Sequence, residues 1–263
     1  MHKIRAGVIP AAGKGRRILD LPLTRVLPKP ILPVLAKPIL EYVIANMKKM
    51  GVRDIFLIVP PNAPVFQEYF RDGREFGTRI TYIEQRRPRG IAHAIGLTRE
   101  YINTPFAVIL GDDLTVTDSF DNLIEIFFKR HAVVAEAVCA EEDKEVLRQT
   151  CCVTLESDGK ILDIEEKPST PQSNVRGCGV YVFDPIVYDY IRKTPESPLR
   201  HEKELTDTIR CIAREKRAYG AVIKGANINI NRAADLFRAT ALLLEKELNR
   251  GSTEAEEGCS HHG

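Results

Sequence analysis

Several features that mark specialised classes of protein are missing from this sequence. Its 263 residues carry 38 Lys and Arg against 36 Asp and Glu, so the basic excess typical of nucleic-acid-binding proteins is absent. No apolar run approaches the roughly 20 residues that a membrane-spanning helix needs, and no hydrophobic signal stretch follows Met1. We therefore expect a cytoplasmic protein whose partners include neither a nucleic acid polymer nor a membrane.

The six cysteines show neither metal-binding nor disulfide spacing. Cys151 and Cys152 are adjacent, and the others are scattered without a C-x-x-C pair. In a cytosolic chain such residues are expected to be reduced thiols in or near the core. An obvious Ser/His/Asp or Cys/His constellation is also lacking, and we interpret the lone His93 as a surface or packing residue rather than a catalyst.

Apolar runs and amphipathic stretches alternate through the first half of the chain. Strands alternating with helices predict a parallel, doubly wound sheet of the α/β class. The expected strands cover residues 4–9, 55–59, 79–84, 106–110 and 133–138, and the expected helices cover residues 38–50, 64–72, 91–101 and 120–131.

The second half changes character. Asp158-Gly159 between two extended stretches predicts a hairpin, and a further strand is expected over 177–183. Long helices are expected over 202–216 and 233–250, after which periodicity is lost. We expect a single mixed α/β domain over residues 1–250, in two parts that meet at about residue 140, and a disordered tail over 251–263.

A glycine-rich loop follows the first strand. Its small residues leave room for the backbone to wrap an anion, with N–H groups pointing at phosphate oxygens. The spacing matches neither G-x-x-x-x-G-K-S/T nor the complete G-x-G-x-x-G, and the loop alone is equally compatible with a tight strand-to-helix turn. The nucleotide-binding candidates in this loop are Ala11, Ala12, Gly13, Lys14, Gly15 and Arg16, with Arg17 adding mobile positive charge.

The loop continues into a proline-rich segment, Leu21 to Val34, which cannot be a helix. Loop and segment together resemble the sugar-phosphate nucleotidyltransferases, such as glucose-1-phosphate thymidylyl- and uridylyltransferases, whose signature is approximately L-A-A-G-x-G-T-R-L-x-P-L-T-x-x-x-P-K-P. The resemblance implies a Rossmann-like mixed sheet, with Arg17 and Lys29 as catalytic residues that contact the triphosphate and the sugar phosphate. Arg16 stands where the family usually has Thr.

Later motifs resemble the same family in the same order. In the stretch from Gln85 to Ala94, similar to Q-x-x-P-x-G-T-A-x-A, the resemblance implies that Gln85 reads the base and that Pro88 and Gly90 lie beside the nucleotide. Two further motifs, similar to E-K-P and G-x-G-x-Y-x-F, imply a sugar site made of Glu166, Lys167 and Gly179.

A Mg²⁺ cofactor is expected from two further positions. Asp112 closes a buried strand next to Gly111, where a carboxylate is well placed to hold Mg²⁺ against phosphates. The family's second metal ligand, an Asp, corresponds to Asn229, although the segment can also be aligned so that Asn231 is the equivalent. Asn offers a carbonyl oxygen without charge.

The resemblance implies a nucleotidyltransferase that joins a sugar 1-phosphate, glucose 1-phosphate in the first instance, to dTTP or UTP, giving a nucleotide-diphospho-sugar for biosynthesis. It also implies that the nucleotide-binding part covers about residues 1–140 and the sugar-binding part about residues 141–250. The departures Arg16 and Asn229 leave a non-catalytic nucleotide-sugar sensor or assembly subunit as the alternative. A dinucleotide-dependent oxidoreductase is disfavoured, because the proline-rich segment replaces the helix that would receive the pyrophosphate. The chain ends before the acyltransferase domain of many relatives, which argues against a bifunctional role, and homo-oligomerisation is left open.

Overall fold

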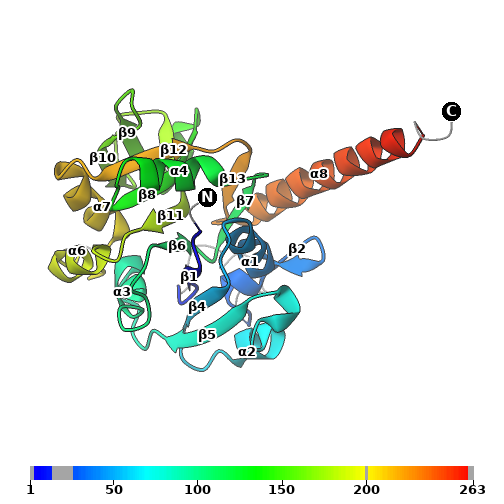
Figure 1. Ribbon diagram of the computed structural model, residues 1–263, viewed down its shortest axis with the longest axis horizontal. Helices are drawn as coiled ribbons and strands as arrows, with labels where there is room; N and C mark the ends of the chain where they lie inside the picture. Colours follow the sequence, from blue (N-terminus) through cyan, green and yellow to red (C-terminus); the bar gives the residue numbers. More distant parts are fainter. Residues whose placement is uncertain (1–2, 14–25, 199–200, 260–263) are drawn as a thin grey trace.

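The computed structural model describes residues 3–13, 26–198 and 201–259. A nine-stranded sheet forms its centre (Figure 1). The main path runs β10-β9-β11-β6-β1-β4-β5, while β8 pairs with β11 and β12 pairs with β8. The strands are β1 (Ala6–Pro10), β4 (Asp54–Val59), β5 (Arg79–Glu84), β6 (Phe106–Ile109), β8 (Val134–Ala140), β9 (Cys151–Leu155), β10 (Ile161–Glu166), β11 (Val175–Phe183) and β12 (Ala218–Val222).

Strand direction divides this sheet into two parts. β4, β1 and β6 run parallel, as do β4 and β5, whereas β11 runs antiparallel to β6, β8 and β9. The expected hairpin at Gly159 is present, since β9 and β10 pair antiparallel and Gly159 has φ +86°. The prediction of a doubly wound, mixed α/β sheet in a single domain is confirmed.

Helices cover both faces of the sheet. One core contains apolar side chains of α1 (Ile39–Lys49), α2 (Pro64–Phe70) and α4 (Asp121–Lys129). The other contains those of α3 (Ile91–Gly96), α6 (Val187–Lys193) and α7 (Leu205–Arg214). Two packed layers on a sheet whose strands are buried on both faces explain why most strands read as continuous apolar runs.

Three helices differ clearly in length from the expectation, and one of them, α7, covers Leu205–Arg214 rather than residues 202–216. α3 ends at Gly96 rather than at residue 101. Next to this end, the Thr98 hydroxyl donates to the Ile95 carbonyl at 2.7 Å and competes with helical hydrogen bonding. α8 (Ala233–Cys259) extends nine residues beyond the predicted end at Arg250, through a segment with three Glu and one Ala, which favour helix, and two Gly, which do not. The division of the chain at residue 250 stays a prediction.

Short elements that periodicity did not predict complete the fold. They are the two-stranded sheets β7 (Asp113–Val116) with β13 (Ala226–Asn229) and β2 (Pro33–Val34) with β3 (Lys37–Pro38), helix α5 (Lys144–Gln149), and the 3-10 helices η3 (Lys29–Ile31) and η4 (Arg74–Phe76). Asp143 caps α5, because its carboxylate accepts from the Glu145 N–H at 2.8 Å.

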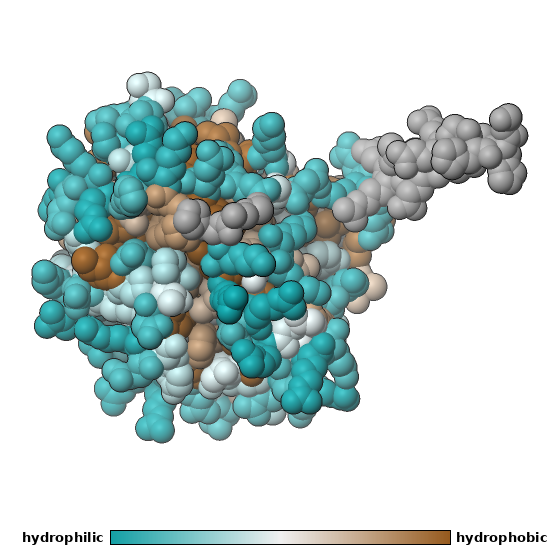
Figure 2. Space-filling view, viewed as in Figure 1, coloured by the Kyte–Doolittle hydropathy of each residue, from teal (hydrophilic) through white to brown (hydrophobic). Residues whose placement is uncertain are grey.

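The surface of the described part is mixed. Figure 2 shows hydrophilic side chains over most of one face, with apolar side chains gathered in a band across its middle. No helix among the described residues is long and apolar enough to cross a membrane. The cysteines whose side chains are described are free thiols, and Cys151, Cys152 and Cys178 are buried, as predicted.

Candidate active site

The carboxyl ends of the parallel strands bring the first candidate residues to one edge of the sheet. Ala11, directly after β1, donates its N–H to the Ile58 carbonyl at 2.8 Å. Gly111, after β6, donates to the Pro10 carbonyl at 3.1 Å, and a Cβ on Gly111 would lie 3.2 Å from the Ala11 Cβ. The loops after β1 and β6 are therefore in contact. Ala11 and Ala12 are buried and Gly13 is exposed, while Lys14, Gly15, Arg16 and Arg17 lie outside the described residues.

Lys29 joins three distant parts of the chain. It begins η3, and its side chain is only 8% exposed. Its Nζ lies 2.6 Å from Oδ2 of Asp112 and donates to Oδ1 of Asn231 at 3.4 Å. Asp112 is 36% exposed, so its carboxylate reaches solvent beside the ammonium. The proline-rich segment thus delivers a buried cation to the acidic end of β6.

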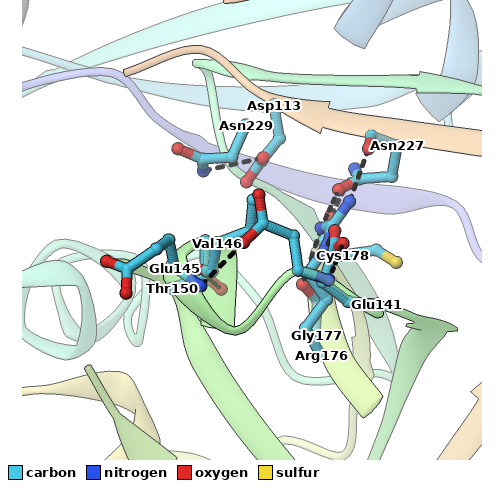
Figure 3. A network of polar contacts seen from close by, with 11 residues as sticks. Asp113, Glu141, Glu145, Val146, Thr150, Arg176, Gly177, Cys178, Asn227 and Asn229 are labelled. Atoms are coloured by element: carbon cyan, nitrogen blue, oxygen red, sulfur yellow. Dashed lines mark hydrogen bonds and ion pairs between the residues drawn. The ribbon is translucent and has the colours of Figure 1, made fainter. Parts of the chain in front are cut away.

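Pairing of β7 with β13 brings Asn229, the other asparagine proposed as a metal ligand, to the end of β6. Asn229 lies opposite Asp113 in this ladder and donates from Nδ2 to Oδ1 of Asp113 at 2.8 Å (Figure 3). Asn231 donates from Nδ2 to Oδ1 of Asn229. Asn229 therefore contacts Asp113, whereas Asn231 shares Lys29 with Asp112. Burial, reinforced by Asp112, raises the pKa of Asp113 to about 8, against the opposing effects of Lys29 and Asn229.

A second polar network extends from β13. Arg176 on β11 donates to Oδ1 of Asn227 at 2.6 Å and to its carbonyl at 2.5 Å, and its Nε lies 3.3 Å from a Glu141 oxygen (Figure 3). The guanidinium is buried, so these contacts supply the partners that a buried charge requires. Residues of this network line a cavity of about 200 Å³, whose lining also includes Asn229, Asn231 and Thr150.

The predicted base-reading loop forms a compact unit at the end of β5. Gln85 is buried, and its Nε2 donates to the Gly90 carbonyl at 3.2 Å and contacts Nδ1 of His93 at 2.9 Å. Burial, with help from Arg89 and Lys203, lowers the pKa of His93, which favours the neutral ring that can accept this bond. His93 thus supports Gln85, a contact that the interpretation as a surface or packing residue rather than a catalyst did not include. Pro88 is half-buried in the same loop.

The sugar-site candidates lie at the ends of β10 and within β11. Glu166 pairs with Cys151 across the hairpin, and its Oε1 lies 3.3 Å from Nζ of Lys167. Gly179 has φ +64°, and a Cβ there would overlap Oδ2 of Asp113. Gly179 therefore lies directly against Asp113, which together with Asp112 follows the end of β6.

The oxygen donors here suit a hard divalent cation. Among the described residues, no group of three or more His, Cys, Asp or Glu side chains could hold a metal ion by itself. Mg²⁺ is usually bound by one or two carboxylates together with substrate phosphates, so a closed protein cage is not needed. The partly exposed Asp112 carboxylate and the neighbouring amide oxygens of Asn229 and Asn231 fit this pattern.

Sequence patterns missed several polar residues of this region. Asp113, next to the chosen Asp112, is the buried partner of Asn229, and Arg176 anchors β13 through Asn227. Glu136 lies within an apolar strand, and a charged residue inside such a run was the signal that could have identified it.

Comparisons with known proteins agree with this geometry. A family model described as nucleotidyl transferase matches residues 6–245. The bifunctional protein GlmU of Methanocaldococcus jannaschii is 32% identical over 91% of this chain, which spans 54% of that relative's length. The low-salt glycan biosynthesis nucleotidyltransferase Agl11 of Haloferax volcanii is 31% identical, over 95% of this chain and 70% of its own. A UTP–glucose-1-phosphate uridylyltransferase of Staphylococcus epidermidis is 27% identical, over 91% of this chain and 92% of its own length.

Solved structures share the fold. A Bacillus anthracis protein described as a glucose-1-phosphate thymidylyltransferase, in complex with sucrose, superposes with a TM-score of 0.81 and 27% identity, over 90% of this chain and 94% of its own. A UDP-glucose pyrophosphorylase complexed with UDP-glucose also superposes with a TM-score of 0.81, with 25% identity over 92% of this chain and 99% of its own.

Proposed function

The chain belongs to the nucleotidyl transferase family, and from that premise we propose that it joins a sugar 1-phosphate to a nucleoside triphosphate and releases pyrophosphate. UTP and dTTP are the proposed nucleotides and glucose 1-phosphate is the first sugar phosphate to test. The observation that carries the proposal is the position of Lys29, whose ammonium lies between Asp112 and Asn231 at the carboxyl edge of the sheet.

The chemistry follows from two anionic reactants. An oxygen of the sugar phosphate attacks the α-phosphorus, a new P–O bond forms, and the bond from the α-phosphorus to the bridging oxygen of pyrophosphate breaks. The attacking phosphate is already ionised near neutral pH, so no general base is needed. Catalysis then depends on positioning and on charge stabilisation. Mg²⁺, held by Asp112 and Asn229 or Asn231, would neutralise phosphate charge when bound.

Lys29 has a double role in this proposal. Its ammonium neutralises the Asp112 carboxylate in the free protein. When the sugar 1-phosphate, which is the acceptor of the nucleotidyl group, binds, Lys29 holds its phosphate. Arg17, which lies outside the described residues, is proposed to stabilise the departing pyrophosphate. Glu166, Lys167 and Gly179 are proposed to receive the sugar, so that the nucleotide occupies the part before about residue 140 and the sugar the part after it.

Gln85 is proposed to read the base through its carbonyl oxygen. Its Nε2 is already engaged by Gly90 and His93, whereas Oε1 has no hydrogen-bond partner among the described residues. A carbonyl accepts a hydrogen bond, so it is complementary to the N3–H of uracil or thymine. The N–H groups of Ala12 and Gly13, continuing into residues 14–16, are proposed to receive the phosphates, since the Ala11 N–H is engaged by the Ile58 carbonyl; Pro88 is proposed to shape the base pocket.

The test is an assay of pyrophosphate release with Mg²⁺, each nucleoside triphosphate and a panel of sugar 1-phosphates. Release with UTP or dTTP and one sugar phosphate supports the proposal, and absence of release with every pair contradicts it. Tight binding of a UDP- or dTDP-sugar without turnover would identify a non-catalytic sensor instead.

A further inference from the structure

Glu136 is a fully buried carboxyl group in the middle of β8. It has 0% exposure, and neither carboxyl oxygen has a hydrogen-bond partner of normal geometry among the residues that the structure describes; the Tyr181 hydroxyl lies near the group without completing such a bond. Buried polar groups in proteins nearly always find partners, so a pair of orphaned oxygens calls for a functional reason. Burial raises the pKa of Glu136 to about 8, with Glu166 and Asp113 adding to the effect and the Tyr181 hydroxyl opposing it. The group is therefore largely uncharged near neutral pH.

The backbone around Glu136 is opened by an irregularity in the sheet. In the ladder between β8 and β11 the register shifts between Gly177 and Tyr181, and Tyr181 lies opposite Glu136. Bulged strands of this kind occur often beside active sites, where they redirect side chains. A Cβ on Gly177 would overlap Oε1 of Glu136 and lie 2.8 Å from Sγ of Cys151. The Glu136 carboxyl thus occupies the place of the side chain that Gly177 lacks.

Two residues further along β11 the same arrangement recurs at the candidate site. A Cβ on Gly179 would overlap Oδ2 of Asp113, the residue that bonds to Asn229. Gly177 and Gly179 therefore leave space for two carboxyl groups side by side. Cys151, which touches the Gly177 notch, pairs with Glu166 across the hairpin. Glu136 is thus linked to the sugar-site candidates through the Gly177 notch and Cys151, and it interacts electrostatically with Glu166.

We propose that Glu136 is a specificity-determining residue for the acceptor, whose carboxyl group gains its missing hydrogen-bond partner from a hydroxyl of the bound sugar phosphate. This inference rests on the proposed function. Because Glu136 has no exposed surface in the free protein, a small displacement of the β11 bulge or of the Glu136 side chain must accompany acceptor binding.

The surroundings favour a hydroxyl over a charged group as the partner. The titratable groups facing Glu136 are Asp113, Glu166, Cys151 and Tyr181, none of which is cationic. An uncharged carboxyl both donates and accepts a hydrogen bond, as a sugar hydroxyl does. An ammonium group on the acceptor would instead require an ionised Glu136, so a glucosamine phosphate serves as a test of the alternative.

The experiment compares two substitutions of Glu136 in the full chain. Glu136→Met replaces the carboxyl by an unbranched apolar group, and Glu136→Gln keeps an uncharged donor and acceptor. We expect Glu136→Met to raise KM for the preferred sugar 1-phosphate about tenfold, as for loss of one hydrogen bond, with KM for the nucleotide unchanged. Glu136→Gln recovers most of that loss. Thr98→Val, which removes a buried hydroxyl bonded to Tyr188, is the matched control and alters stability without changing acceptor KM.

A second readout does not depend on turnover. In an infrared difference spectrum, adding the sugar 1-phosphate alone should shift the C=O stretch of a protonated carboxyl group, and the shift should be absent in Glu136→Met. Unchanged acceptor KM and binding in Glu136→Met overturn the inference while leaving the proposed function intact. A preference for glucosamine 1-phosphate that is lost in Glu136→Gln also overturns it. Wild-type protein that neither binds nor converts any sugar phosphate overturns both.

Discussion

Nζ of Lys29 lies 2.6 Å from Oδ2 of Asp112, although 83 residues separate them along the chain. The pair places a cation and a partly exposed carboxylate at the carboxyl end of β6. The proposed reaction brings two anions together, so it requires both a cation that holds the sugar phosphate, which Lys29 supplies, and a carboxylate that holds Mg²⁺, which Asp112 supplies. The contact therefore provides the basis for the first prediction.

Lys29→Ala is expected to reduce turnover by about 10²- to 10³-fold, because it removes the cation that holds the attacking sugar phosphate beside the anionic nucleotide. Steady-state pyrophosphate assays provide the measurement. Lys37→Ala, which removes an exposed lysine paired with Glu41, is the control and should leave turnover nearly unchanged. A Lys29→Ala enzyme as fast as the wild type would remove Lys29 from the mechanism.

Asn229 and Asn231 can be separated by matched substitutions. If Asn229 is the second Mg²⁺ ligand, Asn229→Ala should raise the Mg²⁺ concentration needed for half-maximal rate by about tenfold or more, in the range for lost metal contacts. Asn231→Ala should then have the smaller effect, through Lys29. Mg²⁺ titrations of both variants at saturating substrates provide the comparison, and the reverse order would assign the ligand to Asn231.

His93→Ala should weaken nucleotide binding without affecting binding of the sugar 1-phosphate. The substitution removes the ring nitrogen that contacts Nε2 of Gln85 at 2.9 Å and frees the amide to rotate. We expect KM for the nucleotide to rise about threefold to tenfold, as for one hydrogen bond. Because the pKa of His93 is lowered, wild-type nucleotide KM should stay constant at neutral pH and rise only in acid, as the ring becomes charged. His131→Ala, at an exposed position, is the control.

Glu136→Gln should be more stable than the wild type, with a difference that depends on pH. The pKa of this carboxyl is raised from 4.5 to about 8 in the fold, so unfolding releases a proton between these values. Wild-type stability therefore falls as pH rises from about 4.5 to 8, whereas Gln cannot titrate. The Tm difference should be small at pH 5 and largest at pH 8. A constant difference across thermal melts in this range would contradict the assignment, and Glu156→Gln, at the surface, supplies the baseline.

Gly179→Ala should destabilise the protein and abolish activity. The position has φ +64°, and the added Cβ would overlap Asp113, which is buried and bonded to Asn229. Backbone strain and overpacking each cost about 1–3 kcal/mol. Gly96→Ala is the matched control, since its Cβ would lie 3.4 Å from Ile191. Denaturation midpoints of the two variants measure the contrast, and equal midpoints would show that the notch tolerates a side chain.

Local pattern was a sound guide wherever one residue type dominates an element. The apolar runs of β1, β4 and β6 appear where expected, and α1 lies within the expected range 38–50, with Gly51, at φ +91°, directly after it. The sequence did not predict β7 and β13, because each has only four residues and its alternation of polar and apolar side chains is too short to identify a strand. Both strands depend on pairing across more than a hundred residues, which neither segment reveals by itself.

By itself, the sequence determined the fold class, the family and most of the candidate residues, because strand periodicity, the glycine-rich loop and the proline-rich segment are local and leave their mark in the order of residues. Only the tertiary structure decided which polar groups meet. It placed Lys29 on Asp112, Asn229 on Asp113 and the orphaned carboxyl of Glu136 in the notch at Gly177. Such contacts depend on sheet register and burial, which arise only when distant segments pack together.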